Sequence, residues 1–211
     1  MNEFKSKRNR VWLENGRVNK FIPAGAGAAR AEAEILRRLY AAGVAVPLVL
    51  DVLSGEYEKG EKGEKGEKGG MLILEYVSGL TLTEEIEREI LCAETLAERI
   101  TRWFAAFYAV FPGRIRGDVN CRNFIVGPDM RISGVDFEDL PRGAKETDLG
   151  RMTAFILNYD PPHTDYKKRL ARSLTDCFCA KFTADRELAA REYAQETEKM
   201  RERRGRRRQR E

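Results

Sequence analysis

The sequence predicts an α+β protein with two lobes, of which the first contains a β-sheet and the second is mainly helical. Three observations support this prediction. Short apolar runs between turn residues dominate the first third of the chain, helical periodicity dominates the rest, and the change occurs near residues 78–80. The length of 211 residues suits one sizeable domain or two small lobes. We expect a first lobe at 1–78, a second at 79–200 and a basic tail at 201–211.

The first lobe is predicted to hold an antiparallel sheet and one helix. Its expected elements are, in order, a hairpin, a helix and two strands, at residues 11–22, 28–42, 48–53 and 71–77. Asn15-Gly16 is a tight-turn dipeptide between two short apolar runs, which indicates the hairpin. The helical segment is rich in residues of high helix propensity and stops before Gly43, a residue that commonly ends helices.

A charged tandem repeat, EKGEKGEKGEKGG, occupies residues 58–70. Its period of three fits neither a helix face nor a strand face, and it lacks the proline of a collagen triplet. We interpret it as a solvated insertion in a loop between two strands, because loop-closure entropy grows slowly with length. A charged recruitment element is the less favoured alternative.

The second lobe is predicted to be helical, with two short strands. Helical patterns are expected at 94–110, 148–158, 165–182 and 184–204, and the strands at 124–126 and 131–135. The aromatic residues at 103–111 fall at helical spacing without interleaved lysines. This pattern favours a buried core over a platform for stacking nucleic-acid bases.

The composition excludes several classes of protein. Four cysteines and one histidine, His163, form neither a CxxC pair nor a zinc-ligand set. The N-terminal sequence has no apolar stretch of a secretory signal, and no apolar run reaches membrane-spanning length. The formal charge of +4 is concentrated in the tail, which has seven arginines and two glutamates. We therefore expect a cytoplasmic protein without membrane contact.

Residues 116–139, RGDVNCRNFIVGPDMRISGVDFED, carry the pattern with the strongest chemical meaning. An aspartate precedes an asparagine by five positions, and a strand, a turn, a second strand and Asp-Phe follow. This stretch resembles the catalytic core of the protein-kinase-like superfamily, nearest to aminoglycoside and choline phosphotransferases and RIO-type atypical kinases. The likeness covers roughly residues 11–158. It implies a two-lobed kinase-like fold with a reduced N-terminal lobe and a short helical C-terminal lobe.

By this resemblance, Asp118 is the catalytic base that orients the acceptor hydroxyl. The resemblance also implies that Asn123 and Asp136 bind Mg²⁺ and that the second substrate is ATP. Phosphoryl transfer needs positioning and charge stabilisation, and Mg²⁺ prefers oxygen ligands, so these residue types suit the chemistry.

The upstream half of the chain agrees with the same family. Lys20 stands where the family has a phosphate-positioning lysine, and Glu32 stands where its helix glutamate partner is found. Glu34 is the alternative partner, since residues two apart on a helix point in different directions. Glu75 and Val77, at the end of the strand that leads out of the first lobe, are expected to contribute to the nucleotide-binding site.

Asp148 resembles the family's later aspartate, which supports the backbone of the catalytic loop. Its alternative interpretation is an ordinary helix N-cap. Two departures from the family pattern concern the first lobe. No G-x-G-x-x-G lid precedes Lys20, where too few residues remain for two full strands and a loop. The glycine-rich residues 23–27 follow the lysine and are expected to lead into the helix rather than to bind phosphate.

The expected function is transfer of a phosphoryl group from ATP to a hydroxyl of a small molecule. Only eleven residues separate Asp136 from Asp148, too few for the long segment on which protein kinases seat a peptide. Two alternatives remain open: a catalytically degenerate pseudokinase that serves as an interaction module, and an atypical serine kinase or ATPase of an RNA-modification complex. The short connection would also suit a partner protein that completes the site. RNA contact through 201–211 is less favoured than a solvated helix end.

Overall fold

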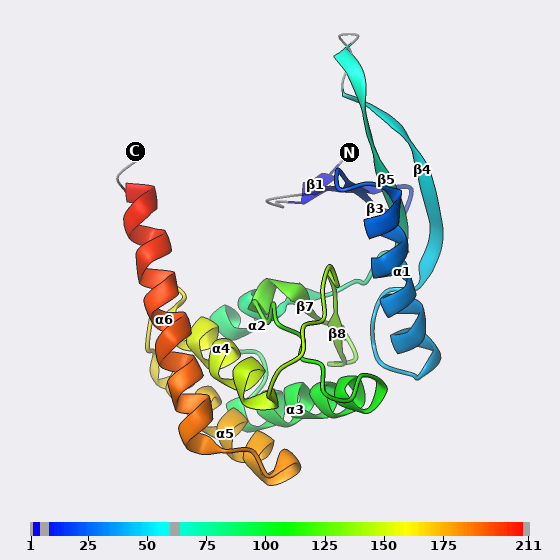
Figure 1. Ribbon diagram of the computed structural model, residues 1–211. Helices are drawn as coiled ribbons and strands as arrows, with labels where there is room; N and C mark the ends of the chain where they lie inside the picture. The colour runs from blue at the N-terminus through cyan, green and yellow to red at the C-terminus, as the bar shows by residue number, and fades with distance from the viewer. Residues whose placement is uncertain (1, 5–8, 60–63, 209–211) are drawn as a thin grey trace. The chain divides into compact units, whose positions relative to one another are not determined.

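The fold is seen in a computed structural model that describes residues 2–4, 9–59 and 64–208. It contains an antiparallel sheet in its N-terminal part and several helices after it (Figure 1). The predicted α+β fold class is therefore confirmed. None of the helices in the described ranges is both long enough and apolar enough to cross a membrane.

The chain forms two compact units. The first unit comprises Met1–Ser78 together with Gly134–Asp139, and the second comprises Gly79–Ser133 and Leu140–Glu211. The backbone N–H of Gly134 donates to the carbonyl of Ala45 at 3.0 Å, which ties the short later segment to the first unit. The Asp-Phe pair of the sequence motif consequently belongs to the unit that contains Lys20.

The first unit is a five-stranded antiparallel sheet with one helix packed against it. The strand order is β1-β2-β3-β5-β4. The elements are β1 (Asn2–Phe4), β2 (Arg10–Glu14), β3 (Arg17–Ile22), α1 (Ala26–Ala41), β4 (Val49–Lys59) and β5 (Glu64–Glu75). Helix α1 contacts β3, β4 and β5 through a buried face of alanine and leucine side chains. The predicted hairpin is β2–β3, and its turn residues Asn15 and Gly16 have φ of 51° and 72°, as a tight hairpin turn requires.

Two strands, β1 and β2, precede the strand that contains Lys20. The sequence predicts too few residues there for two full strands and a loop. Strand β1 is only three residues long and pairs with β2, with Asn2 opposite Leu13 and Phe4 opposite Val11. A strand rises about 3.3 Å per residue, so three residues are enough for a short edge strand. The connection between β1 and β2, residues 5–8, lies outside the described residues.

Strands β4 and β5 continue into the EKG repeat, so the interpretation of this whole segment as a loop is wrong. Tyr57 pairs with Glu67, and Lys59 pairs with Glu64. An antiparallel ladder is held by backbone hydrogen bonds that every residue except proline can form. A segment with no apolar pattern can therefore extend a hairpin that its neighbours have started. Residues 60–63 of the repeat lie outside the described part of the chain.

Glycines allow α1 to approach the sheet closely. Gly25, with φ of 99°, is the N-cap of α1, which confirms that residues 23–27 lead into the helix. A Cβ atom on Gly70 of β5 would lie 2.6 Å from the Cβ of Ala29 and 2.8 Å from the carbonyl oxygen of Gly25. Only glycine fits at this contact between the first turns of α1 and the sheet.

The second unit consists mainly of helices, which confirms the prediction for this part of the chain. Its elements are β6 (Leu80–Thr81), α2 (Leu82–Arg88), α3 (Ala93–Val110), η1 (Cys121–Asn123), β7 (Phe124–Val126), β8 (Ile132–Gly134), α4 (Lys145–Asn158), α5 (Asp165–Phe182) and α6 (Arg186–Arg208). Helix α3 packs on α5, and α4 packs on both α5 and α6 (Figure 1). Strands β6, β7 and β8 form a small sheet.

Two details of this unit were not predicted. Helix α2 begins with a capping box, in which Thr81 and Glu84 exchange side-chain and backbone hydrogen bonds. The T-x-x-E pattern at these positions is the sequence signal that could have located the helix. Helix α6 runs as far as Arg208, so it includes most of the predicted basic tail, and the side chains at 201–206 are exposed.

The aromatic residues of α3 form the core of the second unit, as their spacing predicts. Trp103 and Phe104 are almost fully buried, and their ring centroids lie 5.1 Å and 6.0 Å from that of Phe124 in β7. Phe104 also contacts Phe178 of α5 at 5.6 Å. This cluster fixes β7, and therefore the end of the 116–123 segment, against the rigid helical layer.

We expect Gly150→Ala to destabilise the second unit by about 2–3 kcal/mol. A Cβ atom at this position of α4 would lie 2.5 Å from the carbonyl oxygen of Ala189, 2.6 Å from Glu192 Cβ and 2.7 Å from Tyr193 N, all on α6. Gly205→Ala is the matched control, because α6 is helical there and a Cβ atom on Gly205 would meet no other atom within 4 Å. The control should be neutral or stabilising by up to about 1 kcal/mol. Equal unfolding midpoints in urea for the two variants would contradict the close α4–α6 contact.

Candidate functional site

The first unit contains a buried lysine held by carboxylates. Lys20 lies on β3, opposite Leu72 of β5, and is 4% exposed. Its Nζ donates to both carboxylate oxygens of Glu32 on α1, at 2.9 Å and 2.8 Å. Glu32 is itself 2% exposed, and its Oε1 also accepts the backbone N–H of Phe137 at 3.0 Å. Strand, helix and the Asp-Phe segment are thus joined at one ion pair.

Two further acidic residues lie around the same ammonium group. Asp136 accepts a hydrogen bond from Lys20 Nζ, and an oxygen of Glu138 lies 3.8 Å from it. Both carboxylates are partly exposed, at 40% and 39%, whereas the Lys20 side chain is buried. Asp136 has φ of 67°, a left-handed conformation that is uncommon outside glycine and often marks functional sites. Asn9 next to β2 donates to Glu138 and holds its side chain.

Burial and the neighbouring carboxylates act in opposite directions on the charge of Lys20. Burial alone would lower the pKa of Lys20, but the carboxylates of Glu32 and Asp136 raise it above its ordinary value, so the ammonium form is favoured. Burial raises the pKa of Glu32, and the Lys20 ammonium opposes that rise. The Lys20 ammonium and the Glu32 carboxylate therefore stabilise each other's charged form in a buried position.

The remaining candidates of the first unit lie elsewhere in it. Glu34, the alternative partner of Lys20, is exposed on α1, while Glu32 makes the contact. Glu75 ends β5, and its backbone N–H donates to the carbonyl of Leu48 at 2.9 Å while its side chain accepts from Leu48 N at 3.3 Å. Val77 follows in a half-exposed segment without regular structure. Neither contacts Lys20 through a hydrogen bond or ion pair among the described residues.

In the second unit, Asp148 anchors the start of the 116–123 segment. It lies in the first turn of α4 and is fully buried. Its Oδ2 accepts the backbone N–H of Arg116 at 2.7 Å and the hydroxyl of Tyr108 at 2.9 Å, and its Oδ1 accepts the N–H of Gly117 at 2.9 Å. Burial raises the pKa of Asp148, although these hydrogen bonds favour its ionised form. The N-cap of α4 is Ala144, so Asp148 does not cap the helix.

Gly117 is held on both sides of its backbone. Asp148 accepts its N–H, and Arg151 donates to its carbonyl oxygen at 3.2 Å. The φ of Gly117 is 74°, and the N–H of Asp118 turns back to the carbonyl of Arg116 at 2.9 Å. This tight turn presents Asp118 at the surface, where its side chain is exposed. The sequence did not indicate the roles of Arg151 and Tyr108, because each binds a residue more than thirty positions away along the chain.

Asp118 and Asn123 stand at the two ends of one short turn. Oδ1 of Asp118 accepts the backbone N–H of Asn120 at 3.2 Å, and the N–H of Asn123 donates to the carbonyl of Asn120 at 2.8 Å. Asn123 is the last residue of the short helix η1 (Cys121–Asn123), which follows directly after this turn. The turn and η1 together span the five positions that separate Asp118 from Asn123 in the sequence.

The predicted site residues thus occur as two groups. Lys20, Glu32 and Asp136 meet in the first unit, while Asp118 and Asn123 share a turn supported by Asp148 in the second. Within the described ranges, no three Asp, Glu, His or Cys side chains form a ready-made metal centre. Asp136 and Asn123 each carry a side-chain oxygen of the kind that Mg²⁺ prefers.

Two solved structures of WbdD have folds similar to that of this chain. The chain is similar to a crystal structure of WbdD, with a TM-score of 0.53 at 14% identity over 93% of this chain and 50% of that one. It is also similar to WbdD in complex with the kinase inhibitor LY294002, with a TM-score of 0.52 at 17% identity over 89% and 49%. A third structure, described as the bifunctional kinase-methyltransferase WbdD, has a TM-score of 0.49 at 18% identity.

The chain spans about half the length of these WbdD chains. No family model and no curated protein matches its sequence. At such identities the likeness concerns the fold, which is α+β and consistent with a reduced kinase-like architecture.

Proposed function

We propose that the protein is an ATP- and Mg²⁺-dependent phosphotransferase that acts on a hydroxyl of a small molecule. The observation that carries the proposal is the buried Lys20, whose Nζ is bonded to Glu32 of α1 and to Asp136 of the Asp-Phe pair. The likeness of the fold to WbdD, one structure of which contains a kinase inhibitor, supports the same activity.

In this proposal, Lys20 binds phosphate oxygens of ATP. Glu32 holds the side chain of Lys20 in the conformation that extends from β3. Both carboxylate oxygens of Glu32 contact the ammonium, so the rotamer of Lys20 is fixed before nucleotide binds. A phosphate would replace Asp136 as a partner of Lys20, since Asp136 is partly exposed and can turn toward solvent while Glu32 is buried.

The residue types around Lys20 suit a divalent cation. The carboxylates of Glu32, Asp136 and Glu138 all lie at ion-pair distance from its ammonium group, and carboxylate oxygens are ligands that Mg²⁺ prefers. Asp136 and Asn123 are the residues that we expect to bind this cation. Bound Mg²⁺ would neutralise charge on the phosphates during transfer.

Asp118 would orient the acceptor hydroxyl and take up its proton. Its carboxylate is exposed, with Oδ1 accepting a backbone N–H and Oδ2 making no hydrogen bond among the described residues. The clamped backbone of Gly117 fixes the direction from which it projects. A small acceptor is favoured because only eleven residues lie between Asp136 and Asp148.

Thermal unfolding with ATP and Mg²⁺ tests this proposal. A ligand that binds only the native state at a hundred times its dissociation constant stabilises it by about 2.7 kcal/mol, so the midpoint of wild type should rise by roughly 5–10 °C. We expect Asp136→Ala to lose the Mg²⁺-dependent part of this shift. Asp51→Ala, at an exposed position of β4 in the same unit, is the control and should shift like wild type.

Each variant is compared with itself with and without ligand, so any change in its own stability cancels. A wild-type midpoint that is indifferent to ATP and Mg²⁺ together would contradict the proposal and favour a pseudokinase. The sequence of the β1–β2 connection, Lys5-Ser6-Lys7-Arg8, which contains no glycine, is the observation in favour of that second candidate.

A further inference from the structure

Asn120 connects the two functional side chains of the 116–123 segment. Its N–H donates to Asp118 Oδ1 and its carbonyl accepts from Asn123 N. Its side-chain Oδ1 accepts the backbone N–H of Arg122 at 3.0 Å and therefore caps η1. Any group that fixes the side chain of Asn120 consequently fixes the turn on which Asp118 and Asn123 both depend.

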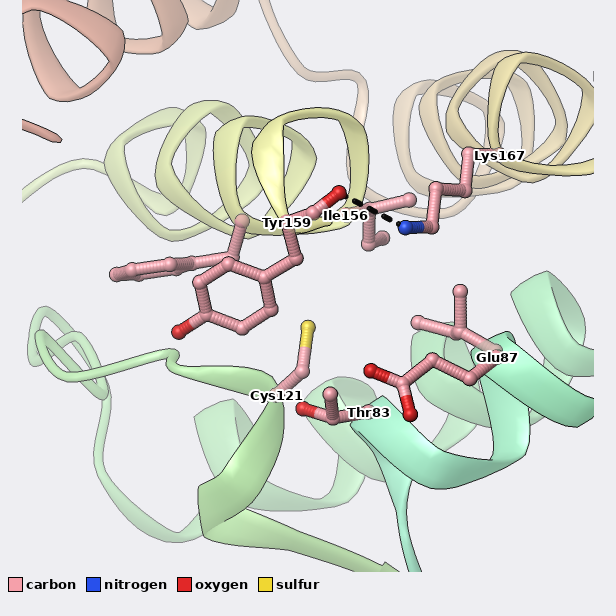
Figure 2. Close-up of a pocket in the computed structure, with 8 residues that line it drawn as sticks. Thr83, Glu87, Cys121, Ile156, Tyr159 and Lys167 are labelled. Atoms are coloured by element: carbon pink, nitrogen blue, oxygen red, sulfur yellow. Dashed lines mark hydrogen bonds between the residues drawn. The ribbon is translucent and has the colours of Figure 1, made fainter. Parts of the chain in front are cut away.

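Tyr159 is such a group. It is the C-cap residue of α4, and its hydroxyl donates to Oδ1 of Asn120 at 2.9 Å. Its own backbone is held by Lys167 of α5, which is 2% exposed and donates from Nζ to the carbonyl of Tyr159 at 3.0 Å and to that of Pro161 at 2.8 Å. Figure 2 shows the bond from Lys167 to Tyr159 and the tyrosine ring above Cys121, the first residue of η1.

The space behind the turn is too small for a substrate. Tyr159, Lys167, Cys121 and Thr83 line a cavity of about 10 Å³, which is close to the volume that one water occupies (Figure 2). Cys121 is fully buried there, and burial raises its pKa to about 12, so its thiol is neutral. The residues around this cavity therefore pack behind η1 and leave no room for a metabolite.

We propose that Tyr159 is a positioning residue of the phosphotransferase site, held by Lys167 and acting on Asp118 and Asn123 through Asn120. The inference rests on the proposed function for its catalytic consequence, while the structural part of it stands on the contacts alone. In this role Tyr159 would act through Asn120 without touching substrate or metal. The Tyr159 hydroxyl holds the turn at Asn120, whereas Asp148 holds the start of the same segment at Arg116 and Gly117.

Tyr159→Phe is the variant that tests this role, because it removes the hydroxyl and keeps the ring. Tyr166→Phe is the matched control: its hydroxyl donates to the carbonyl of Leu91 at 2.8 Å in the same unit, and it makes no hydrogen bond to the described 116–123 segment. In hydrogen exchange, we expect the amides of Arg122 and Asn123 to exchange roughly fivefold faster in Tyr159→Phe, as for the loss of one hydrogen bond. Tyr166→Phe should leave their rates within about twofold of wild type.

Amides in α3 report on global destabilisation in both variants. Unchanged rates at Arg122 and Asn123 in Tyr159→Phe, or equal increases in both variants, would overturn the positioning role. This readout needs no activity, so it remains decisive even when the ATP and Mg²⁺ shift of wild type is absent and the proposed function fails.

Steady-state kinetics tests the catalytic consequence when wild type is active. Tyr159→Phe should lower kcat roughly fivefold to tenfold with KM for ATP within about twofold, since Lys20 and the first unit are untouched. Tyr166→Phe should match wild type in both. A fall in kcat that is the same in the two variants would show a general loss of stability and overturn the inference.

Discussion

Asp118→Asn is expected to reduce turnover on the order of a hundredfold or more while the Mg²⁺-ATP thermal shift stays at its wild-type size. The reason is that a general base contributes typically 10² to 10⁴ in rate, and an amide cannot accept the hydroxyl proton. An asparagine side chain keeps an oxygen that can accept the N–H of Asn120, so the turn should persist. The measurement is kcat and the unfolding midpoint for the same protein preparations.

Asp129→Asn is the matched control. Asp129 is exposed, and its Oδ1 accepts the backbone N–H two residues later at 3.0 Å, as Asp118 accepts that of Asn120 at 3.2 Å. The two substitutions thus change the same kind of turn in the same unit, and the control should keep wild-type turnover. Unchanged turnover in Asp118→Asn would show that another residue is the base. Loss of turnover in both variants would mean that the turns, not the carboxylate, were disturbed.

The parts of the fold that could be predicted from the sequence are those with local causes. Asn15-Gly16 identified the first hairpin because its left-handed backbone is rare in other residues, and the apolar spacing of α3 identified the core of the second unit. The contact of Lys20 with Glu32 was expected from the family likeness and not from spacing. The structure adds that both oxygens of Glu32 are used and that Asp136 shares the lysine.

Other features could not be predicted because their causes are not local. The EKG repeat extends β4 and β5 through backbone pairing, to which its side-chain pattern gives no guide. The hydroxyl of Tyr159 meets Asn120 across 39 residues of sequence, and a single tyrosine after a helical segment carries no signal for that contact. The supports of the turn lie in the packing of α4 and α5, whereas the turn itself is visible in the sequence.

Asp148→Asn is expected to lower the free energy of unfolding by about 3 kcal/mol and the thermal midpoint by roughly 6–12 °C. The carboxylate is fully buried and accepts from three donors, of which two are the backbone N–H groups of Arg116 and Gly117. An amide accepts through one oxygen only and directs its own N–H₂ toward a donor. At least one buried donor is then left without a partner, and each such group costs about 1–3 kcal/mol.

The size of this loss tests the anchoring role of Asp148, because the loss of a single capping hydrogen bond typically costs only about 1 kcal/mol. Tyr108→Phe is the internal standard: it removes one neutral donor from the same carboxylate and should cost about 1 kcal/mol. A loss in Asp148→Asn no larger than that of Tyr108→Phe would contradict an anchoring role. If the larger loss is found, turnover should fall as well, since the clamped Gly117 that directs Asp118 depends on the same oxygen atoms. The free energy of unfolding and the turnover would then both decrease when Asp148 is replaced, because the carboxylate supports the backbone that directs Asp118.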